Sequence, residues 1–204
     1  MPITRALPWI VITAALGAFA GGITARMLAQ KPIALQAGTW LPQPRSLAHF
    51  KLRDFNGRAY GNDALNGHPS LLFFGYTYCP DICPATLAVL RDVQRQAPLP
   101  DLQVLFITVD PDRDTAAVLK QYLGGFNTRF VGLSAGLDEL APLMRSVAAA
   151  SERDRRANGS FHLDHSATLY LLDSRGRLAA VFSPPLATAT LASDLRALGQ
   201  AAVL

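Results

Sequence analysis

Cysteine is scarce in this chain, since its 204 residues contain only two. Two cysteines are too few for a disulfide framework in a chain of this length, so they matter, if at all, as a single site. Charged residues make up 17% of the chain and hydrophobic residues 50%, which excludes disorder over most of its length. Glycine and proline follow no period and no heptad is sustained, which excludes collagen-like and coiled-coil chains. The composition therefore indicates one folded domain with additional segments.

Positive charge is also low outside the N-terminus. The formal net charge is +4, but Arg5 and Arg26 flank an apolar N-terminal segment. Residues 31–204 carry 17 Lys and Arg against 15 Asp and Glu, a net charge of +2. A balance so small and so mixed in sign is not the electrostatic footprint of a nucleic-acid-binding protein. We therefore expect no nucleic-acid partner.

The N-terminal segment is the one long uncharged run, residues 6–25 (ALPWIVITAALGAFAGGITA). A helix of that length is about 30 Å long, which is the thickness of a bilayer core. We expect residues 1–30 to be a single transmembrane anchor in the bacterial inner (cytoplasmic) membrane. Residues 18–20 (AFA) have the small-x-small form of a cleavage site, so a signal peptide remains the alternative. In either case we expect the large C-terminal part on the periplasmic side.

The segment after the anchor, residues 31–46, holds three prolines and no hydrophobic period. This pattern is typical of a linker, and we expect it to tether the membrane segment to the folded part. Residues 47–204 then form the folded domain.

Strands and helices alternate along that domain. Short apolar runs predict strands at 70–76, 103–109, 129–133, 167–172 and 178–182, after a hairpin of 47–53 and 58–60. Helices are expected at 84–96, 114–123 (with Asp114 as N-cap), 137–149 and 188–198, and residues 151–160 are expected to be a polar loop. This order predicts an α/β fold, with a mixed sheet of four or five strands between helices.

Cys79 and Cys83 form a C-x-x-x-C pair where the predicted strand 70–76 leads into the predicted helix 84–96. Such a junction favours a thioredoxin-like fold, and in open α/β sheets it is where sites form. A helix N-terminus favours the thiolate, the reactive form of cysteine. The spacing permits a disulfide and equally permits both sulfurs to bind one metal ion. The alternative is that both side chains are small buried hydrophobic groups.

A third ligand would decide between a metal site and a redox pair. Two thiolates are too few for a structural zinc site, whereas two thiolates and one imidazole suit copper. Of the four histidines, His49 and His68 lie next to predicted turns and are expected to be solvent-exposed.

The other two histidines precede the predicted strand 167–172. In a thioredoxin-like fold the loop before this strand faces the cysteine turn, which makes His165 the candidate ligand. His162 is expected to be solvated or a secondary metal contact. Asp164 is either an acceptor that orients the imidazole or a loop cap.

Three motifs carry a family resemblance. Residues 75–84 (GYTYCPDICP), 109–115 (VDPDRDT) and 164–166 (DHS) resemble, in order, the signatures of the Sco/SenC family of copper proteins. The resemblance implies a membrane-tethered, thioredoxin-like copper chaperone that serves the dinuclear copper centre of cytochrome c oxidase. The implied partners are the copper-receiving oxidase subunit and other copper chaperones.

Carried over by position, Cys79 and Cys83 match the family's copper-binding cysteines, and His165 matches its histidine ligand. Asp110 matches an aspartate associated with target interaction or copper handling, although its alternative role is to cap a turn. The sequence departs at Tyr78, where many relatives have histidine, a position that is not a family ligand. We expect copper, as Cu(I), Cu(II) or both, to be carried rather than turned over, so the chain is not expected to be an enzyme and a monomer suffices.

Two alternatives stay open. A thiol–disulfide oxidoreductase would use Cys79 and Cys83 without needing His165, and a redox or copper sensor would share all three residues. Thioredoxins usually place a cis-proline in the loop facing the cysteines, and residues 164–166 contain none. The residues therefore favour the metal site.

Overall fold

The computed structural model describes residues 33–96, 99, 101–149, 151–155, 161–165, 167–201 and 203–204, and it gives the backbone alone for 151–155 and 161–165. Within these residues, no helix combines the length and the apolar character needed to cross a bilayer. The expected anchor, residues 1–30, lies outside them and stays a prediction.

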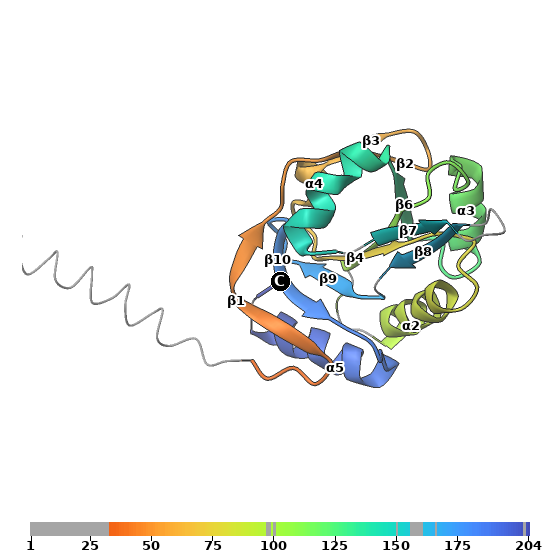
Figure 1. Cartoon of the computed structure of the whole chain (residues 1–204). Helices are drawn as coiled ribbons and strands as arrows, with labels where there is room; N and C mark the ends of the chain where they lie inside the picture. The colour runs from red at the N-terminus through yellow and green to blue at the C-terminus, as the bar shows by residue number, and fades with distance from the viewer. Residues whose placement is uncertain are drawn as a thin grey trace, which may run out of the picture. The chain divides into compact units, whose positions relative to one another are not determined.

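Eight strands form one mixed sheet in the order β1-β10-β9-β4-β5-β6-β2-β3 (Figure 1). The strands are β1 (Gly38–Ser46), β2 (Lys51–Asp54), β3 (Ala59–Gly61), β4 (Ser70–Gly75), β5 (Gln103–Thr108), β6 (Val131–Ser134), β9 (Leu169–Leu172) and β10 (Arg177–Phe182). β4, β5 and β6 are parallel neighbours, and the remaining pairs are antiparallel. The sheet is wider than the expected four or five strands because β1 and the β2–β3 hairpin extend its two edges.

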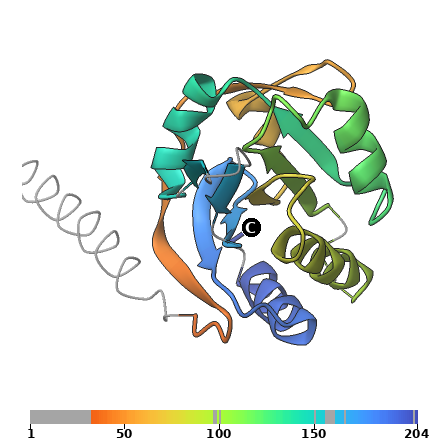
Figure 2. The ribbon, with the colours of Figure 1, turned by 45° about the vertical axis from the view of Figure 1, so that its right-hand side comes forward.

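The helices are α2 (Ile82–Gln96), α3 (Ala116–Gly124), α4 (Leu137–Val147) and α5 (Thr188–Gln200), with a short 3₁₀ helix at Asn62–Leu65. α2 and α5 contact each other on one side of the sheet, and α4 lies across the strands from them (Figures 1 and 2). The predicted mixed α/β sheet flanked by helices is therefore confirmed.

The central strands are buried along their whole length, which explains why continuous apolar runs predicted them. All six residues of β4 and all four of β9 are buried. Phe73 of β4 and Phe106 of β5 meet edge to face, with ring centroids 5.7 Å apart. This core fixes the carboxyl ends of β4 and β5, from which the two loops of the candidate site emerge.

Part of the expected linker is a strand instead. β1 pairs with β10, and its register shifts between Trp40 and Arg45, so Pro42 and Pro44 fall where the ladder is interrupted. An edge strand tolerates proline at such an irregularity because no ladder donor is lost there. Pro42 and Pro44 therefore belong to an irregular edge strand and not to a flexible linker.

The segment before β1 is also attached to the domain. The carboxylate of Asp194 in α5 accepts hydrogen bonds from the backbone amides of Gln36, at 2.9 Å, and Ala37, at 2.8 Å. Asp194 is 2% exposed, so these amides take the place of solvent around its charge. The domain's ordered structure thus begins before residue 47.

The expected loop at 151–160 is a second correction. β7 (Ser151–Arg155) pairs antiparallel with β8 (Phe161–His165) in a separate two-stranded ribbon, while residues 156–160 lie outside the description. The sequence SERDR shows no apolar alternation. The β7–β8 ribbon lies outside the main sheet, and the backbone hydrogen bonds between its two strands do not require alternating apolar side chains.

Candidate metal centre

The two cysteines lie in and just after the turn between β4 and α2. Cys79 is 8% exposed and Cys83 is fully buried in the first turn of α2, which begins two residues earlier than predicted. The backbone amide of Cys83 donates a hydrogen bond to Sγ of Cys79 at 3.4 Å, and the amide of Cys79 donates to the carbonyl of Tyr76 at 3.2 Å. No disulfide joins the two sulfurs. The prediction that Cys79 and Cys83 lie at a strand-to-helix junction is therefore confirmed. Both sulfurs lie near the N-terminal end of α2.

Cys83 packs into space that a glycine provides. A Cβ atom on Gly75, the last residue of β4, would lie 2.9 Å from Sγ of Cys83 and 2.8 Å from a ring carbon of Phe106. Real Cβ atoms do not approach that closely, so glycine is required for this sulfur to sit against the strand. The packing places Cys83 on the sheet side of the turn and Cys79 on the outer side.

Burial outweighs the helix terminus in setting the state of Cys83. Desolvation raises the pKa of the Cys83 thiol well above its ordinary value, although the backbone near Tyr76 lowers it in part. We expected a thiolate favoured by the helix N-terminus, and for Cys83 burial has the larger effect. Burial also raises the pKa of Tyr76, and Cys79 and Cys83 add to that rise. Cys83 is therefore a neutral thiol at physiological pH.

Asp114 connects the cysteine turn to the loop after β5. Its carboxylate accepts hydrogen bonds from the amide of Thr77, at 3.0 Å, and from the hydroxyls of Thr77 and Thr108. The expected N-cap role is wrong, because Thr115 caps α3 and accepts from the amide of Val118. Asp114 is 1% exposed and fully supplied with donors, so it fixes the two loops against each other.

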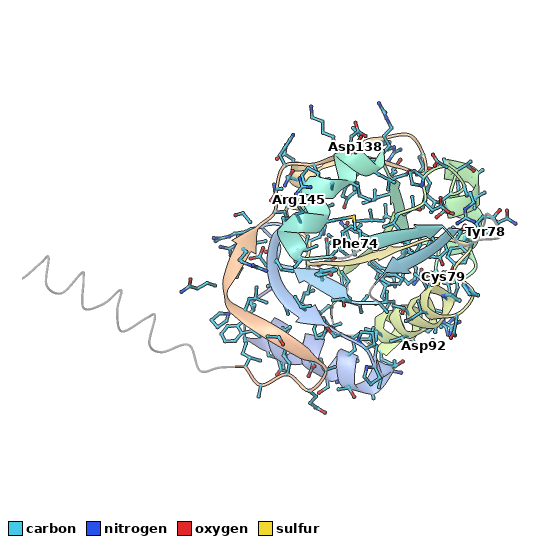
Figure 3. The ribbon with its side chains drawn as sticks, viewed as in Figure 1. Phe74, Tyr78, Cys79, Asp92, Asp138 and Arg145 are labelled. Atoms are coloured by element: carbon cyan, nitrogen blue, oxygen red, sulfur yellow. The ribbon has the colours of Figure 1, made fainter. Side chains whose placement is uncertain are left out.

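Asp110, the candidate from the sequence, lies in the same loop and is 5% exposed. Its amide donates to the hydroxyl of Thr108 at 3.0 Å, and its carboxylate accepts from Nε of Arg113. The guanidinium of Arg113 lies over the ring of Tyr78, 5.1 Å from the centroid. Tyr78 and Cys79 lie at the same end of the molecule beside α2 (Figure 3). No pattern in the sequence indicated the Arg113–Tyr78 contact.

The predicted histidine ligand lies on β8, not in a loop. His165 pairs with Ser151 at one end of the ribbon, Asp164 pairs with Glu152, and His162 pairs with Asp154. Their side chains, and Ser166, lie outside the description, so ligation by His165 and the role of Asp164 stay predictions.

The other histidines are exposed, as expected: His49 follows β1 and His68 precedes β4. Among the side chains that the structure describes, no group of three or more His, Cys, Asp or Glu is placed to hold a metal ion. The described part of the site is therefore the sulfur pair alone.

A large groove lies elsewhere, with a volume of about 1080 Å³. It runs between the β2–β3 hairpin and the starts of α3 and α4, and Asp114 and Thr115 line it. Neither cysteine lines it, so the sulfur pair lies outside this groove.

Comparison with known proteins agrees with the motifs. The family model described as SCO1/SenC matches residues 41–200. The SCO2-like protein RP587 of Rickettsia prowazekii is 35% identical over 153 residues, covering 72% of this chain and 74% of that protein. The structure of Bradyrhizobium japonicum ScoI with copper bound has a TM-score of 0.67 at 36% identity, covering 74% of this chain and 98% of that one.

Yeast Sco1 with copper bound gives a TM-score of 0.70 at 29% identity, with 77% of this chain and 90% of that chain covered. These neighbours share the fold described above and were solved with copper bound. The match to the family model extends over most of the chain, from within β1 to the end of α5. On these grounds the chain belongs to the SCO1/SenC family.

Proposed function

We propose that the chain is a copper metallochaperone that binds one copper ion through Cys79, Cys83 and His165. The observation that carries the proposal is the pair of unbridged cysteines at the β4–α2 turn, linked by a hydrogen bond from the Cys83 amide to Cys79 Sγ, in a chain of the SCO1/SenC family. Copper bound to two of the structural neighbours supports the choice of metal. Two soft sulfur donors with one imidazole suit copper, and Asp164 would orient that imidazole.

Copper is cargo in this proposal. Binding displaces the thiol protons, so Cys79 and Cys83 act as thiolate ligands once loaded. The transfer to a partner is ligand exchange without change in the oxidation state of the metal. Cys79 is the more exposed of the two sulfurs, so exchange begins there, while the fully buried Cys83 holds the ion last. Oxidation of the pair to a disulfide would remove both ligands and prevent loading.

The receiving partner in our proposal is the copper-binding subunit of cytochrome c oxidase, the role that the sequence motifs imply for the family. Residues 1–30 would hold the domain at the inner membrane with the copper site on the periplasmic side. One chain supplies both cysteines, so a monomer is sufficient for this role.

A thiol–disulfide oxidoreductase is the second candidate. It is favoured by the close approach of Cys79 Sγ to the Cys83 amide, which brings the Cys79 sulfur to the first turn of α2, where Cys83 lies. Such an enzyme would reduce a partner's disulfide while Cys79 and Cys83 are oxidised to one. This candidate does not need His165.

The deciding experiment is a Cu(I) titration of the full chain, reduced, in mild detergent and without oxygen, against a competing chelator. We expect one tight equivalent in the wild type and a large loss of affinity in Cys83→Ser and His165→Ala. His68→Ala is the matched control, because His68 is an exposed histidine before β4. Unchanged affinity in His165→Ala would overturn the three-ligand site.

A second assay separates the two candidates. The wild type and His165→Ala are compared for oxidase assembly in cells grown at low copper and for reduction of a disulfide peptide. A chaperone loses assembly in His165→Ala, whereas an oxidoreductase keeps both activities. Equal assembly by the two proteins would exclude the chaperone.

A further inference from the structure

The two residues before Cys79 are held at two points by one loop. The amide and hydroxyl of Thr77 are bound by Asp114, and the ring of Tyr78 lies under the guanidinium of Arg113. Both partners belong to the loop that follows β5, the parallel neighbour of β4. The cysteine turn and this loop are thus attached at Thr77, through its backbone amide and its hydroxyl, and at Tyr78, through its ring.

The contact at Tyr78 depends on Arg113, which has two partners. Arg113 donates to the carboxylate of Asp110, whose side chain is buried, and stacks on Tyr78. Asp110 is itself fixed through its amide to Thr108. A planar guanidinium can donate from its edge while its face lies on a ring, whereas an ammonium group cannot do both in the same way. Asp110 therefore holds the Arg113 guanidinium in place over the Tyr78 ring.

The position of Tyr78 matters because it is adjacent to Cys79. Sγ of Cys79 accepts the hydrogen bond from the Cys83 amide only while the backbone of residues 77–79 keeps its conformation. Tyr78 is 61% exposed and gains little from burial, so the contact with Arg113 is its principal restraint among the described residues. Loss of that contact leaves the hydrogen bonds of Thr77 with Asp114 and the bond from the Cys79 amide to the Tyr76 carbonyl as the restraints on this turn.

We propose that Arg113 is a positioning residue for Cys79: by bridging Asp110 and Tyr78 it keeps the Cys79 sulfur against the first turn of α2 and limits its access to reagents and partners. The role in copper retention rests on the function proposed above. The effect on the thiol does not, and it can be measured without metal.

The test measures the alkylation rate of Cys79 by iodoacetamide in the reduced full chain in mild detergent, with each cysteine followed by mass spectrometry. Because Cys79 is largely buried, its rate reports local opening of the turn. We expect Arg113→Ala and Tyr78→Leu each to raise the rate about three- to tenfold, the size expected for one cation–π contact and a half-exposed ion pair. The double variant should react no faster than the faster single variant, because both remove the same restraint.

Two controls match these variants. Tyr78→Phe keeps the ring and should react like the wild type. Arg177→Ala breaks an ion pair of similar exposure, Arg177 with Asp173, at the far end of β9 and β10, and should leave the Cys79 rate unchanged. Acceleration in Arg177→Ala would mean general loosening and would overturn the proposal.

The pH profile separates positioning from a charge effect. A positioning role raises the rate by the same factor at pH 7 and pH 9. A charge effect of Arg113 on the thiolate would shift the midpoint of the profile and would overturn the proposal, as would rates that multiply in the double variant. For the metal, Arg113→Ala should release Cu(I) to a chelator about three- to tenfold faster. If the wild type binds no copper, the proposed function fails while the alkylation result still decides the role of Arg113.

Discussion

The carboxylate of Asp114 accepts a hydrogen bond from the backbone amide of Thr77, at 3.0 Å, and so joins the cysteine turn to the loop after β5. The hydroxyls of Thr77 and Thr108 donate to the same carboxylate. Asp114 is 1% exposed, so water cannot replace these contacts if the carboxylate is removed. The geometry around Cys79 is therefore supported by an aspartate that is not among the predicted copper ligands.

Asp114→Ala should lower the free energy of unfolding by about 2–4 kcal/mol, because three donors lose their acceptor in a buried site. The measurement is urea unfolding of the reduced chain in mild detergent. Thr115→Ala is the matched control; it removes the N-cap of α3 and should cost about 1 kcal/mol. Equal losses in the two variants would show that Asp114 contributes no more than a helix cap.

Gly75→Ala should destabilise the fold by about 1–3 kcal/mol, because its methyl group would meet both Cys83 Sγ and the Phe106 ring. The same push should displace Cys83 and weaken Cu(I) binding in the chelator competition. Gly124→Ala is the control, since a Cβ there meets nothing within 4 Å at the end of α3. A stable Gly75→Ala protein with normal copper affinity would contradict the packing argument.

The sequence predicted the buried strands and the cysteine pair well, for a physical reason. β4, β5 and β9 are covered on both faces, so most of their positions are apolar and the signal is nearly continuous. The pair at Cys79 and Cys83 stood out because cysteine is otherwise absent. These features are local, and local patterns are what a single sequence displays.

The features that were missed depend on contacts between distant segments. β1 was mistaken for a linker because its pairing with β10 cannot be seen from its prolines. Asp114 was expected to cap the helix it precedes, but its carboxylate instead accepts hydrogen bonds from the hydroxyl and amide of Thr77. The stack of Arg113 on Tyr78 arises only once β4 and β5 lie side by side.

Asp194→Ala should release the segment before β1. The variant removes the acceptor of the Gln36 and Ala37 amides, so these amides should lose about one to two powers of ten of hydrogen-exchange protection. Asp92→Ala is the control, because Asp92 pairs with Arg91 on the exposed side of α2. Unchanged exchange at residues 36 and 37 would mean that β1 alone holds this segment.

Alkaline pH should destabilise the fold through Tyr60, whose hydroxyl donates to Gln103 at 3.0 Å. Burial raises the pKa of Tyr60 from 10.0 to about 12. The unfolded chain therefore loses this proton first, so the contribution of Tyr60 to stability is complete below pH 10 and is lost as the pH rises to 12. Allowing for partial solvent screening, the loss is about 1–2 kcal/mol.

The Tyr60→Phe variant isolates this effect from the titration of other groups. The difference in unfolding free energy between wild type and Tyr60→Phe, measured in urea at pH 8, 10 and 11.5, should be constant up to about pH 10 and then shift against the wild type. Lys and Arg titrate equally in both proteins, so their contributions cancel. A difference that stays constant to pH 11.5 would mean that Tyr60 ionises in the folded chain as readily as in the unfolded one.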